Sequence, residues 1–264
     1  MKKYLVIGNP IKHSLSPKLQ NYWLRLNNID AKYEKIKLED HEIDNFIEDI
    51  KQQKITGCNV TVPFKKIIIP FLDKLSLEAQ KTQSVNTIVF DDGDLVGHNT
   101  DIAGFEKAIK KINFNLKDKK ILILGAGGVV PSIIFALNKM KISRITISNR
   151  TRQKAEDLKV QFSYLNVVEW GSLPEVDIII NATSLGLRNE KINLDFSNIG
   201  TNKLFYDAIY NPIETNFLKI GKETGNLSEN GKFMFVYQAL EAFKLWHGVE
   251  PKINQETLKL LEND

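Results

Sequence analysis

Two ionisable residues, Lys65 and Asp101, lie in short stretches that place hydroxyl and amide side chains at expected strand ends. The stretches are GNPIKHSLSP (8–17), NVTVPFK (59–65), SVNT (84–87) and NTD (99–101). In a strand, Asn59 and Thr61 point to the same side, and Lys65 follows within about one turn of the next helix. Converging amides and hydroxyls with a single cation suit a neutral, hydroxyl-rich ligand. The sequence therefore predicts a polar pocket that contains one lysine and one aspartate.

The same residues also have purely structural interpretations. Ser16 is a suitable N-cap for a helix with Pro17 at its first position, and Asp101 is a suitable N-cap for the helix that follows it. Lys65 is next to Lys66 and could be solvated. The residue types alone leave both interpretations open.

A glycine-rich turn is the sharpest single motif of the chain. In ILILGAGGVVPSIIFAL (121–137) a buried strand leads into a helix through Gly125, Ala126, Gly127 and Gly128. Glycines allow close approach to a pyrophosphate, and free N–H groups at a helix start bind the anion. If the helix begins near Gly127 or Gly128, Pro131 falls in its first turn, where a missing N–H costs little. We expect a nucleotide at this turn.

The end of the next strand indicates which nucleotide. An NAD site carries an acidic residue about 20 residues after the glycines, where it binds the ribose hydroxyl. This chain has SNRTRQK (148–154) there, with Asn149, Arg150, Thr151, Arg152 and Lys154 and no acid. Guanidinium and ammonium groups bind a phosphate. The stretch favours NADP over NAD. The alternative, that these basic residues are only the solvated start of a helix, is less favoured.

A third loop follows the strand at 177–180. It reads NATSLG (181–186), and it places Thr183 and Ser184 at the carboxyl end of a parallel strand, where open α/β sheets bind their ligands. We expect a loop that faces the cofactor, with an ordinary polar turn as the alternative.

Short β-type runs alternate with helix-period stretches, which predicts an α/β fold with parallel sheets and right-handed crossovers. In the first half we expect strands at 3–7, 33–38 and 55–60, a hairpin at 85–90 and 94–98, and helices at 16–27, 41–51, after Pro63 and at 100–111. In the second half we expect strands at 121–124, 145–148, 166–169, 177–180 and 203–207, and two helices beyond Gly231. The polar segment 113–120 is a plausible connection between two α/β units.

Composition excludes several classes of protein. The 264 residues are 42% hydrophobic and 26% charged, which is typical of a globular protein, and no apolar run approaches the roughly 18 to 20 residues of a membrane span. A net charge of +4 is spread along the chain, so we expect no nucleic-acid partner. The single cysteine, Cys58, suits a reducing compartment and predicts a cytoplasmic protein. The four histidines lack ligand spacing, so no metal is expected.

Taken together, these motifs resemble the shikimate dehydrogenase family over essentially the whole chain. The family's patterns match 8–17, 59–65, 99–101 with Gly104, the glycine turn, 149–151, 181–186, DAIYNP (207–212), and Gly231 to Ala239 with Gln238. Several ordered motifs are far more specific than one glycine turn. The resemblance implies NADP-dependent, reversible reduction of 3-dehydroshikimate to shikimate, within aromatic amino-acid biosynthesis.

The resemblance also implies a role for each matching residue. Lys65 and Asp101 are the expected catalytic pair. The expected substrate-binding residues are Ser14 and Ser16 for the carboxylate, Tyr210 near it, and Asn59, Thr61, Asn86 and Gln238 for ring hydroxyls. The expected NADP-binding residues are Gly125, Ala126, Gly127, Gly128, Asn149, Arg150, Thr151, Lys154, Thr183, Ser184 and Gly231.

The implied fold is two α/β domains with a deep cleft between them. An N-terminal substrate-binding and catalytic domain comprises 1–101 plus 238–264, and a Rossmann-type NADP-binding domain comprises 102–237. The sequence is compatible with a monomer or a homodimer. It departs from the family's usual pattern at Val130-Pro131 and at Ile102-Ala103, positions that bear on cofactor affinity and helix geometry rather than on the reaction.

Three other functions remain open on sequence grounds. A quinate-oxidising enzyme of the same family with relaxed cofactor choice would share the polar pocket. A catalytically inactive shikimate sensor would keep the pocket, although the presence of both Lys65 and Asp101 argues against it. Another two-domain NADP oxidoreductase, such as one acting on folate, is disfavoured by the hydroxyl-binding residues.

Overall fold

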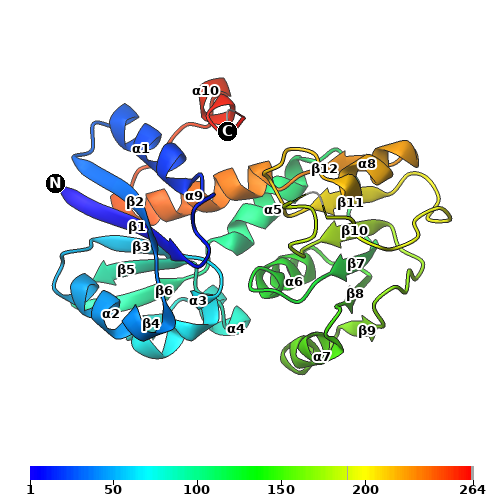
Figure 1. Cartoon of the computed structure of the whole chain (residues 1–264), viewed down its shortest axis with the longest axis horizontal. Helices are drawn as coiled ribbons and strands as arrows, with labels where there is room; N and C mark the ends of the chain where they lie inside the picture. The colour runs from blue at the N-terminus through cyan, green and yellow to red at the C-terminus, as the bar shows by residue number, and fades with distance from the viewer. Residues whose placement is uncertain (189, 263–264) are drawn as a thin grey trace. The chain divides into compact units, whose positions relative to one another are not determined.

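The computed structural model describes residues 1–188 and 190–262, and the chain forms two α/β units. Unit 1 comprises Met1–Gly104 and Val236–Asp264, and unit 2 comprises Phe105–Phe235. The chain leaves unit 1 within helix α5 (Asp101–Lys111) and returns to it within helix α9 (Lys232–His247) (Figure 1). The predicted fold class of two α/β domains is confirmed, while the assignment of substrate and cofactor to the two units stays a prediction.

Unit 1 is built on a six-stranded mixed sheet. Its strands, in spatial order, are β2 (Ala31–Lys37), β1 (Lys2–Gly8), β3 (Gly57–Val60), β5 (Thr87–Asp91), β6 (Asp94–His98) and β4 (Lys74–Leu75). Strand β1 runs parallel to β2 and β3, whereas β5 is antiparallel to β3 and β6. The predicted parallel pairing holds for β2, β1 and β3, and the predicted β5–β6 hairpin is present, but the antiparallel pairing of β3 with β5 differs from the expectation.

Six helices belong to unit 1 in the described part of the chain. They are α1 (Ser16–Leu26), α2 (Ile43–Lys51), α3 (Phe64–Ile67), α4 (Leu77–Thr82), α9 and α10 (Gln255–Lys259), with 3₁₀ turns at Asp40–Glu42 and Ile69–Phe71. Helices α1 and α2 have strongly amphipathic sequences with buried apolar residues. Helix α9 is fixed to its surroundings by two long-range hydrogen bonds. Trp246 Nε1 donates to the Ile88 carbonyl at 3.0 Å, and Gln20 Nε2 of α1 donates to the Ala239 carbonyl at 3.0 Å. These bonds hold the returning segment within unit 1.

Helix α1 begins one residue earlier than expected. Ser16 is its first residue, and Leu15 occupies the N-cap position without a side-chain capping bond. The prediction of Ser16 as N-cap is therefore wrong, although Pro17 does lie in the first turn. The Ser16 side chain instead forms a hydrogen bond with Tyr33.

Unit 2 is built on a six-stranded sheet whose parallel pairing is as predicted, although only five of its strands were expected. Its strands, in spatial order, are β12 (Leu227–Glu229), β11 (Leu204–Asp207), β10 (Ile178–Asn181), β7 (Lys120–Leu124), β8 (Arg144–Ser148) and β9 (Asn166–Val168). Helices α6 (Val130–Lys139), α7 (Arg152–Gln161) and α8 (Asn216–Glu223) complete it with parts of α5 and α9. Strands β7 and β10 are central, and all their residues except Lys120 are buried, which explains their apolar sequences.

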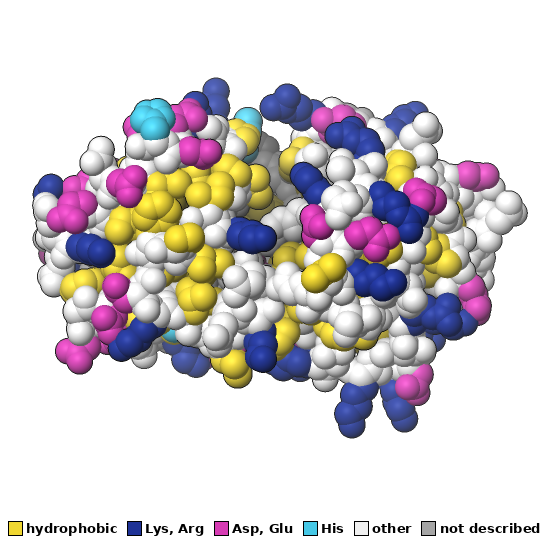
Figure 2. All heavy atoms as spheres, turned by 90° about the horizontal axis from the view of Figure 1, so that it is seen from below, with side chains coloured by type: hydrophobic (Ala, Val, Ile, Leu, Met, Phe, Trp, Pro, Cys, Tyr) yellow, Lys and Arg dark blue, Asp and Glu magenta, His cyan; other side chains and the backbone are white. Residues whose placement is uncertain are grey.

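The surface carries charged side chains of both signs. On the face that Figure 2 shows, basic and acidic side chains are interspersed. Among residues 1–188 and 190–262, no helix combines the length and the apolar character that crossing a membrane requires.

Candidate active site

A buried ion pair joins the two residues that the sequence singles out. Lys65, on α3, lies with its Nζ 2.5 Å from Oδ2 of Asp101, the first residue of α5. The two residues are only 8% and 5% exposed. Burial of an unpaired charge is costly, so each residue requires the other in this position. The interpretation of Lys65 as a solvated lysine is wrong.

Asn86 holds the aspartate in place. Its Nδ2 donates to Asp101 Oδ1 at 2.9 Å and to Thr100 Oγ1 at 2.9 Å, while its Oδ1 accepts the backbone N–H of Thr100 at 2.8 Å. The backbone N–H of Asp101 donates to Asn99 Oδ1 at 3.1 Å. The carboxylate is therefore held at both oxygens, by Lys65 and by Asn86.

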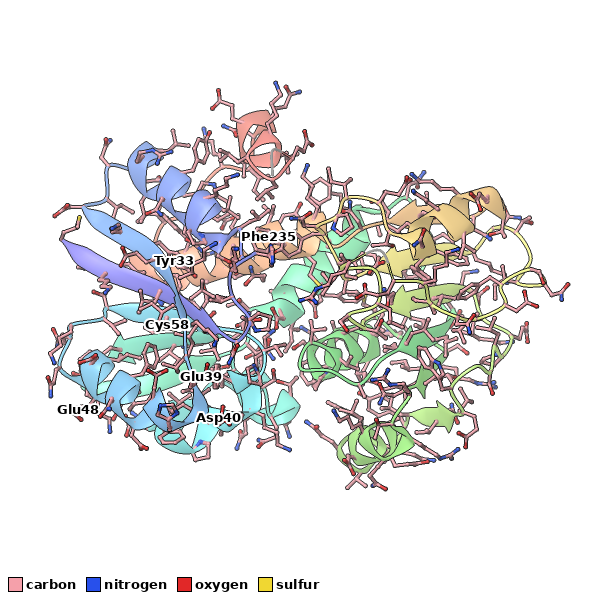
Figure 3. All side chains as sticks on the ribbon, viewed as in Figure 1. Tyr33, Glu39, Asp40, Glu48, Cys58 and Phe235 are labelled. Carbon is pink, nitrogen blue, oxygen red and sulfur yellow. The ribbon has the colours of Figure 1, made fainter. Side chains whose placement is uncertain are left out.

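The network continues from Asn86 toward α1. Asn59 Nδ2 donates to the Asn86 carbonyl at 3.0 Å and to Thr87 Oγ1 at 2.9 Å, and Asn59 Oδ1 accepts the Tyr33 hydroxyl at 2.6 Å. Tyr33, on β2, is fully enclosed (Figure 3). Burial raises the pKa of Tyr33 well above its usual value, and a hydrogen bond with Ser16 opposes that rise. Five of the predicted residues thus belong to one hydrogen-bonded chain.

Sequence reasoning missed two members of this network. Tyr33 lies in a strand with no polar motif around it, and Thr87 was counted only as part of the SVNT stretch. A tyrosine in an alternating strand has the same pattern as any core aromatic residue. Only the pairing of β1 with both β2 and β3 brings Tyr33 to Asn59.

The other predicted substrate-binding residues are divided between the two units. Ser14 is half-buried, and its hydroxyl accepts the backbone N–H of Ser16 at 3.3 Å. Thr61 directly follows β3, and Gln238 is half-buried on the part of α9 that belongs to unit 1. Tyr210 belongs to unit 2, where its ring stacks on Phe235 with centroids 4.3 Å apart.

The glycine turn of unit 2 depends on close backbone approach. Gly125 has φ of +111°, and a Cβ there would lie 2.7 Å from the Ala182 carbonyl oxygen. Ala126 is half-buried, while Gly127 and Gly128 are exposed at the carboxyl end of β7. Helix α6 begins at Val130, two residues later than the latest start expected, and Pro131 lies in its first turn. The turn is therefore longer than predicted and presents exposed backbone.

At the end of β8, two of the three basic side chains are available. Arg152 binds the carboxylates of Glu156, at 2.9 Å, and of Glu169. Arg150 and Lys154 are exposed, and within the described part of the chain neither forms an ion pair. Thr151 is the N-cap of α7 without a capping bond, and its carbonyl accepts Asn149 Nδ2 at 2.8 Å. The expected group of three cations is reduced to two.

The loop after β10 is held by its own hydroxyl. Thr183 Oγ1 donates to Asn181 Oδ1 at 2.7 Å and accepts the backbone N–H of Leu185 at 3.0 Å, whereas Ser184 is exposed. Gly231 lies against the neighbouring backbone, because a Cβ there would lie 2.2 Å from the Ala208 carbonyl oxygen. Thr183 therefore shapes the loop, and any side chain at 231 would displace residue 208.

One buried carboxylate connects these loops. Asp207 ends β11 and accepts hydrogen bonds from Thr215 Oγ1 at 2.6 Å, Asn181 Nδ2 at 3.0 Å and the Ile209 backbone N–H at 3.0 Å. It has no exposed surface, and this burial raises its pKa to about 6 against the lowering effect of the three bonds. Asp207 therefore joins Asn181, which holds the Thr183 loop, to the start of the segment that carries Tyr210.

Comparison with known proteins identifies the family. Residues 6–88 match the shikimate dehydrogenase substrate binding domain, 106–193 match shikimate / quinate 5-dehydrogenase, and 234–255 match the shikimate 5'-dehydrogenase C-terminal domain. A shikimate dehydrogenase (NADP(+)) from Pelagibacter ubique is 54% identical over 262 residues, covering 99% of each chain. The chain belongs to the shikimate dehydrogenase family.

Solved structures of the family have the same fold. Shikimate dehydrogenase from Aquifex aeolicus superimposes with a TM-score of 0.90 at 38% identity, covering 100% of this chain and 98% of that one. The Thermus thermophilus enzyme, solved in complex with NADP(H) and shikimate, gives a TM-score of 0.89 at 31% identity, covering 99% and 97%. The sequence-based resemblance is confirmed.

Replacing Asp207 should change how stability depends on pH. Because the folded-state pKa of about 6 lies above the usual value of 3.8, the stability that Asp207 contributes is present below about pH 4 and is lost as the pH rises through 6. Between pH 5 and 7.5 this loss is about 1 kcal/mol. We expect the free energy of unfolding of Asp207→Asn, measured with urea, not to show this decrease, because the asparagine cannot titrate. Asp195→Asn, an exposed control, should retain it, and an equal pH dependence of wild type and Asp207→Asn would contradict the assignment.

Proposed function

We propose that this chain catalyses the NADPH-dependent, reversible reduction of 3-dehydroshikimate to shikimate. The observation that carries the proposal is the buried Lys65–Asp101 pair at one end of a chain of amides and hydroxyls that reaches Ser16. The shikimate dehydrogenase relatives match over nearly the full chain, which supports the same reaction here. A hydroxylated ring with one carboxylate matches the donors and acceptors of this network.

In the proposed reaction, the Lys65–Asp101 pair donates the proton that the substrate oxygen receives. Bound NADPH supplies the hydride for the carbonyl carbon of the substrate. The carbonyl oxygen then develops negative charge and needs both a nearby cation and a proton. Lys65 offers the cation, and the Lys65–Asp101 pair transfers the proton, which the pair regains from solvent. In the reverse direction the same pair accepts the proton of the substrate hydroxyl.

The hydrogen bonds of the network refine the proposed roles of the two asparagines. Both Nδ2 hydrogens of Asn86 are used by Asp101 and Thr100, so we propose that Asn86 positions Asp101. Asn59 likewise donates both hydrogens within the protein, which leaves one Oδ1 lone pair for a ring hydroxyl.

The remaining substrate contacts are proposed on residue type and family pattern. Ser14 and Ser16 bind the carboxylate through their hydroxyls, with Tyr210 near it. Thr61 and Gln238 bind ring hydroxyls. Ser16 has no capping role, so its hydroxyl can act on the substrate without cost to α1.

Unit 2 has the features that an NADP site requires. Exposed Gly127 and Gly128 present backbone at the carboxyl end of β7, where a pyrophosphate would bind. Arg150 and Lys154 would bind the 2′-phosphate of the ribose, with Asn149 and Thr151 beside them. The Thr183–Ser184 loop and the constricted backbone at Gly231 would border the rest of the cofactor. Cofactor binding by these residues is part of the proposal.

The cellular setting is also a proposal. The one cysteine, Cys58, is fully buried as a free thiol, which suits a reducing compartment such as the cytoplasm. Shikimate and NADP are the proposed partners, and no nucleic-acid partner is required.

The activity is tested directly by following NADPH absorbance with the purified chain. Reduction of NADP and of NAD would be measured with shikimate and with quinate in parallel. We expect turnover to be highest with shikimate and NADP. Binding of shikimate without turnover would indicate a sensor, and higher kcat/KM with quinate and NAD would indicate the quinate-oxidising alternative.

Substitutions at the ion pair should remove chemistry more than binding. We expect Lys65→Met and Asp101→Asn each to lower kcat by about a hundredfold to ten-thousandfold, because the proton and the alkoxide lose their partner. KM for shikimate should change much less. Lys66→Met, at the exposed neighbour on α3, is the matched control and should leave kcat unchanged. Circular dichroism would verify folding, and unchanged turnover of folded Lys65→Met would refute the proposed role.

Cofactor choice should depend on two of the three basic residues. We expect Arg150→Ala and Lys154→Ala each to raise KM for NADP by about tenfold to a hundredfold, since each loses a charge-assisted bond to phosphate. Activity with NAD should be unaffected. Arg152→Ala is the control, because Glu156 and Glu169 already bind that side chain, and its KM for NADP should stay near that of wild type. A larger effect at Arg152 than at Arg150 would contradict this assignment.

A further inference from the structure

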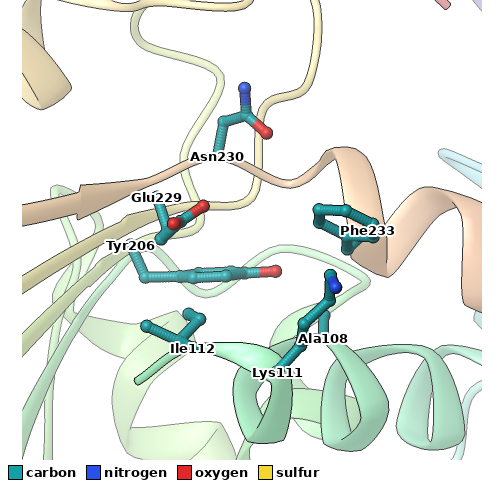
Figure 4. A pocket seen from close by; sticks show the side chains of 7 residues that line it. All are labelled: Ala108, Lys111, Ile112, Tyr206, Glu229, Asn230 and Phe233. Atoms are coloured by element: carbon teal, nitrogen blue, oxygen red, sulfur yellow. The ribbon is translucent and has the colours of Figure 1, made fainter. Parts of the chain in front are cut away.

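Unit 2 contains a cavity that none of the proposed catalytic, substrate or cofactor residues line. Its volume is about 110 Å³, and it lies among α5, β11, β12 and the start of α9 (Figure 4). The lining residues are Ala108, Lys111, Ile112, Tyr206, Glu229, Asn230 and Phe233. They include one cation, one carboxylate and one phenol, which is an unusual set for so small a space.

The Tyr206 hydroxyl is the first indication of a ligand. Tyr206 is 1% exposed, and within residues 1–188 and 190–262 its hydroxyl has no hydrogen-bond partner. Its ring is fixed edge-on by Phe105, with centroids 5.5 Å apart. Figure 4 shows the hydroxyl directed toward the side of the cavity where Phe233 and Lys111 lie. A buried hydroxyl without a partner is costly, so a polar group in the cavity would relieve that cost.

The two charged residues are the second indication. Lys111 Nζ lies 4.8 Å from the centre of the Phe233 ring. Glu229 is half-buried, its pKa is raised by burial, and Lys111 only partly opposes this rise. Among the described residues these two form no ion pair within 4.0 Å. An exposed lysine and a half-buried glutamate thus line one cavity without forming an ion pair in the described part of the chain.

The other polar side chain in the lining is already engaged. Asn230 Nδ2 donates to the Ile213 carbonyl at 2.8 Å, and its Oδ1 accepts the backbone N–H of Lys232 at 3.0 Å. The groups left to meet a ligand are therefore the ammonium of Lys111, the phenol of Tyr206 and the carboxylate of Glu229. Ala108 and Ile112 add a small apolar surface.

We propose that this cavity binds a small zwitterion, an α-amino acid of the size of glycine or alanine. Its carboxylate would accept hydrogen bonds from Lys111 and Tyr206, and its ammonium group would donate to Glu229. A volume of about 110 Å³ is well below the roughly 300–1,000 Å³ of pockets for larger ligands, which limits the side chain to about a methyl group. That methyl group would contact Ala108 or Ile112.

Titration calorimetry with the full chain tests the proposal, using glycine and L-alanine as probes. A ligand of five or six heavy atoms can gain little affinity, so we expect a Kd of about 1 mM. Acetate and methylammonium each carry one of the two charges, and we expect both to bind at least about tenfold more weakly. Equal affinity for acetate and glycine, or no saturable binding of either amino acid at about 100 mM, would overturn the proposal.

Three variants locate the site. We expect Tyr206→Phe, Lys111→Met and Glu229→Gln each to weaken glycine binding by about tenfold. Lys110→Met, at an exposed neighbour on α5 outside the lining, is the matched control and should bind as wild type does. Because Tyr206→Phe removes a hydroxyl without a partner, its melting temperature should not fall. A lower melting temperature with unchanged glycine affinity would show that the hydroxyl is only structural, and would overturn the proposal.

Discussion

The buried ion pair between Lys65 and Asp101 is the constraint on which the organisation of unit 1 depends. Two charges that are 8% and 5% exposed are tolerable only when they are paired and hydrogen-bonded. Asn86 satisfies the second oxygen of the carboxylate, and Asn59 and Tyr33 extend the network to Ser16. The mixed sheet positions the residues of this network: β3 lies between β1 and β5, and this order places Asn59 beside Thr87.

In unit 2 the corresponding constraint is the close approach of backbone segments at the carboxyl ends of the strands. Gly125 lies against Ala182, Gly231 lies against Ala208, and Asp207 ties the following segment to Asn181. These contacts leave no space for side chains at either glycine. They determine the paths of the loops that we propose to hold the cofactor.

The sequence predicted most of the elements and singled out Lys65 and Asp101, which the structure pairs, because its motifs lie at strand ends where local chemistry is informative. The parallel sheet of unit 2 followed from strands that alternate with helices, but the three-residue edge strand β12 has too short and too polar a sequence to be recognised. The prediction that Ser16 caps α1 is wrong, since its partner, Tyr33, is distant in sequence and comes near only where Asn21 of α1 bonds the Tyr33 backbone. Arg152 was grouped with the phosphate-binding cations because Glu169, which binds it, lies 17 residues further along the chain.

The central claim is that Lys65 and Asp101 act as one catalytic unit. A double-mutant cycle on kcat for shikimate oxidation, with Lys65→Met, Asp101→Asn and the double variant, tests it most directly. If the pair acts as a unit, the double variant loses about as much rate as either single variant. Losses that multiply across the two substitutions would show that the residues act independently, and would contradict this account.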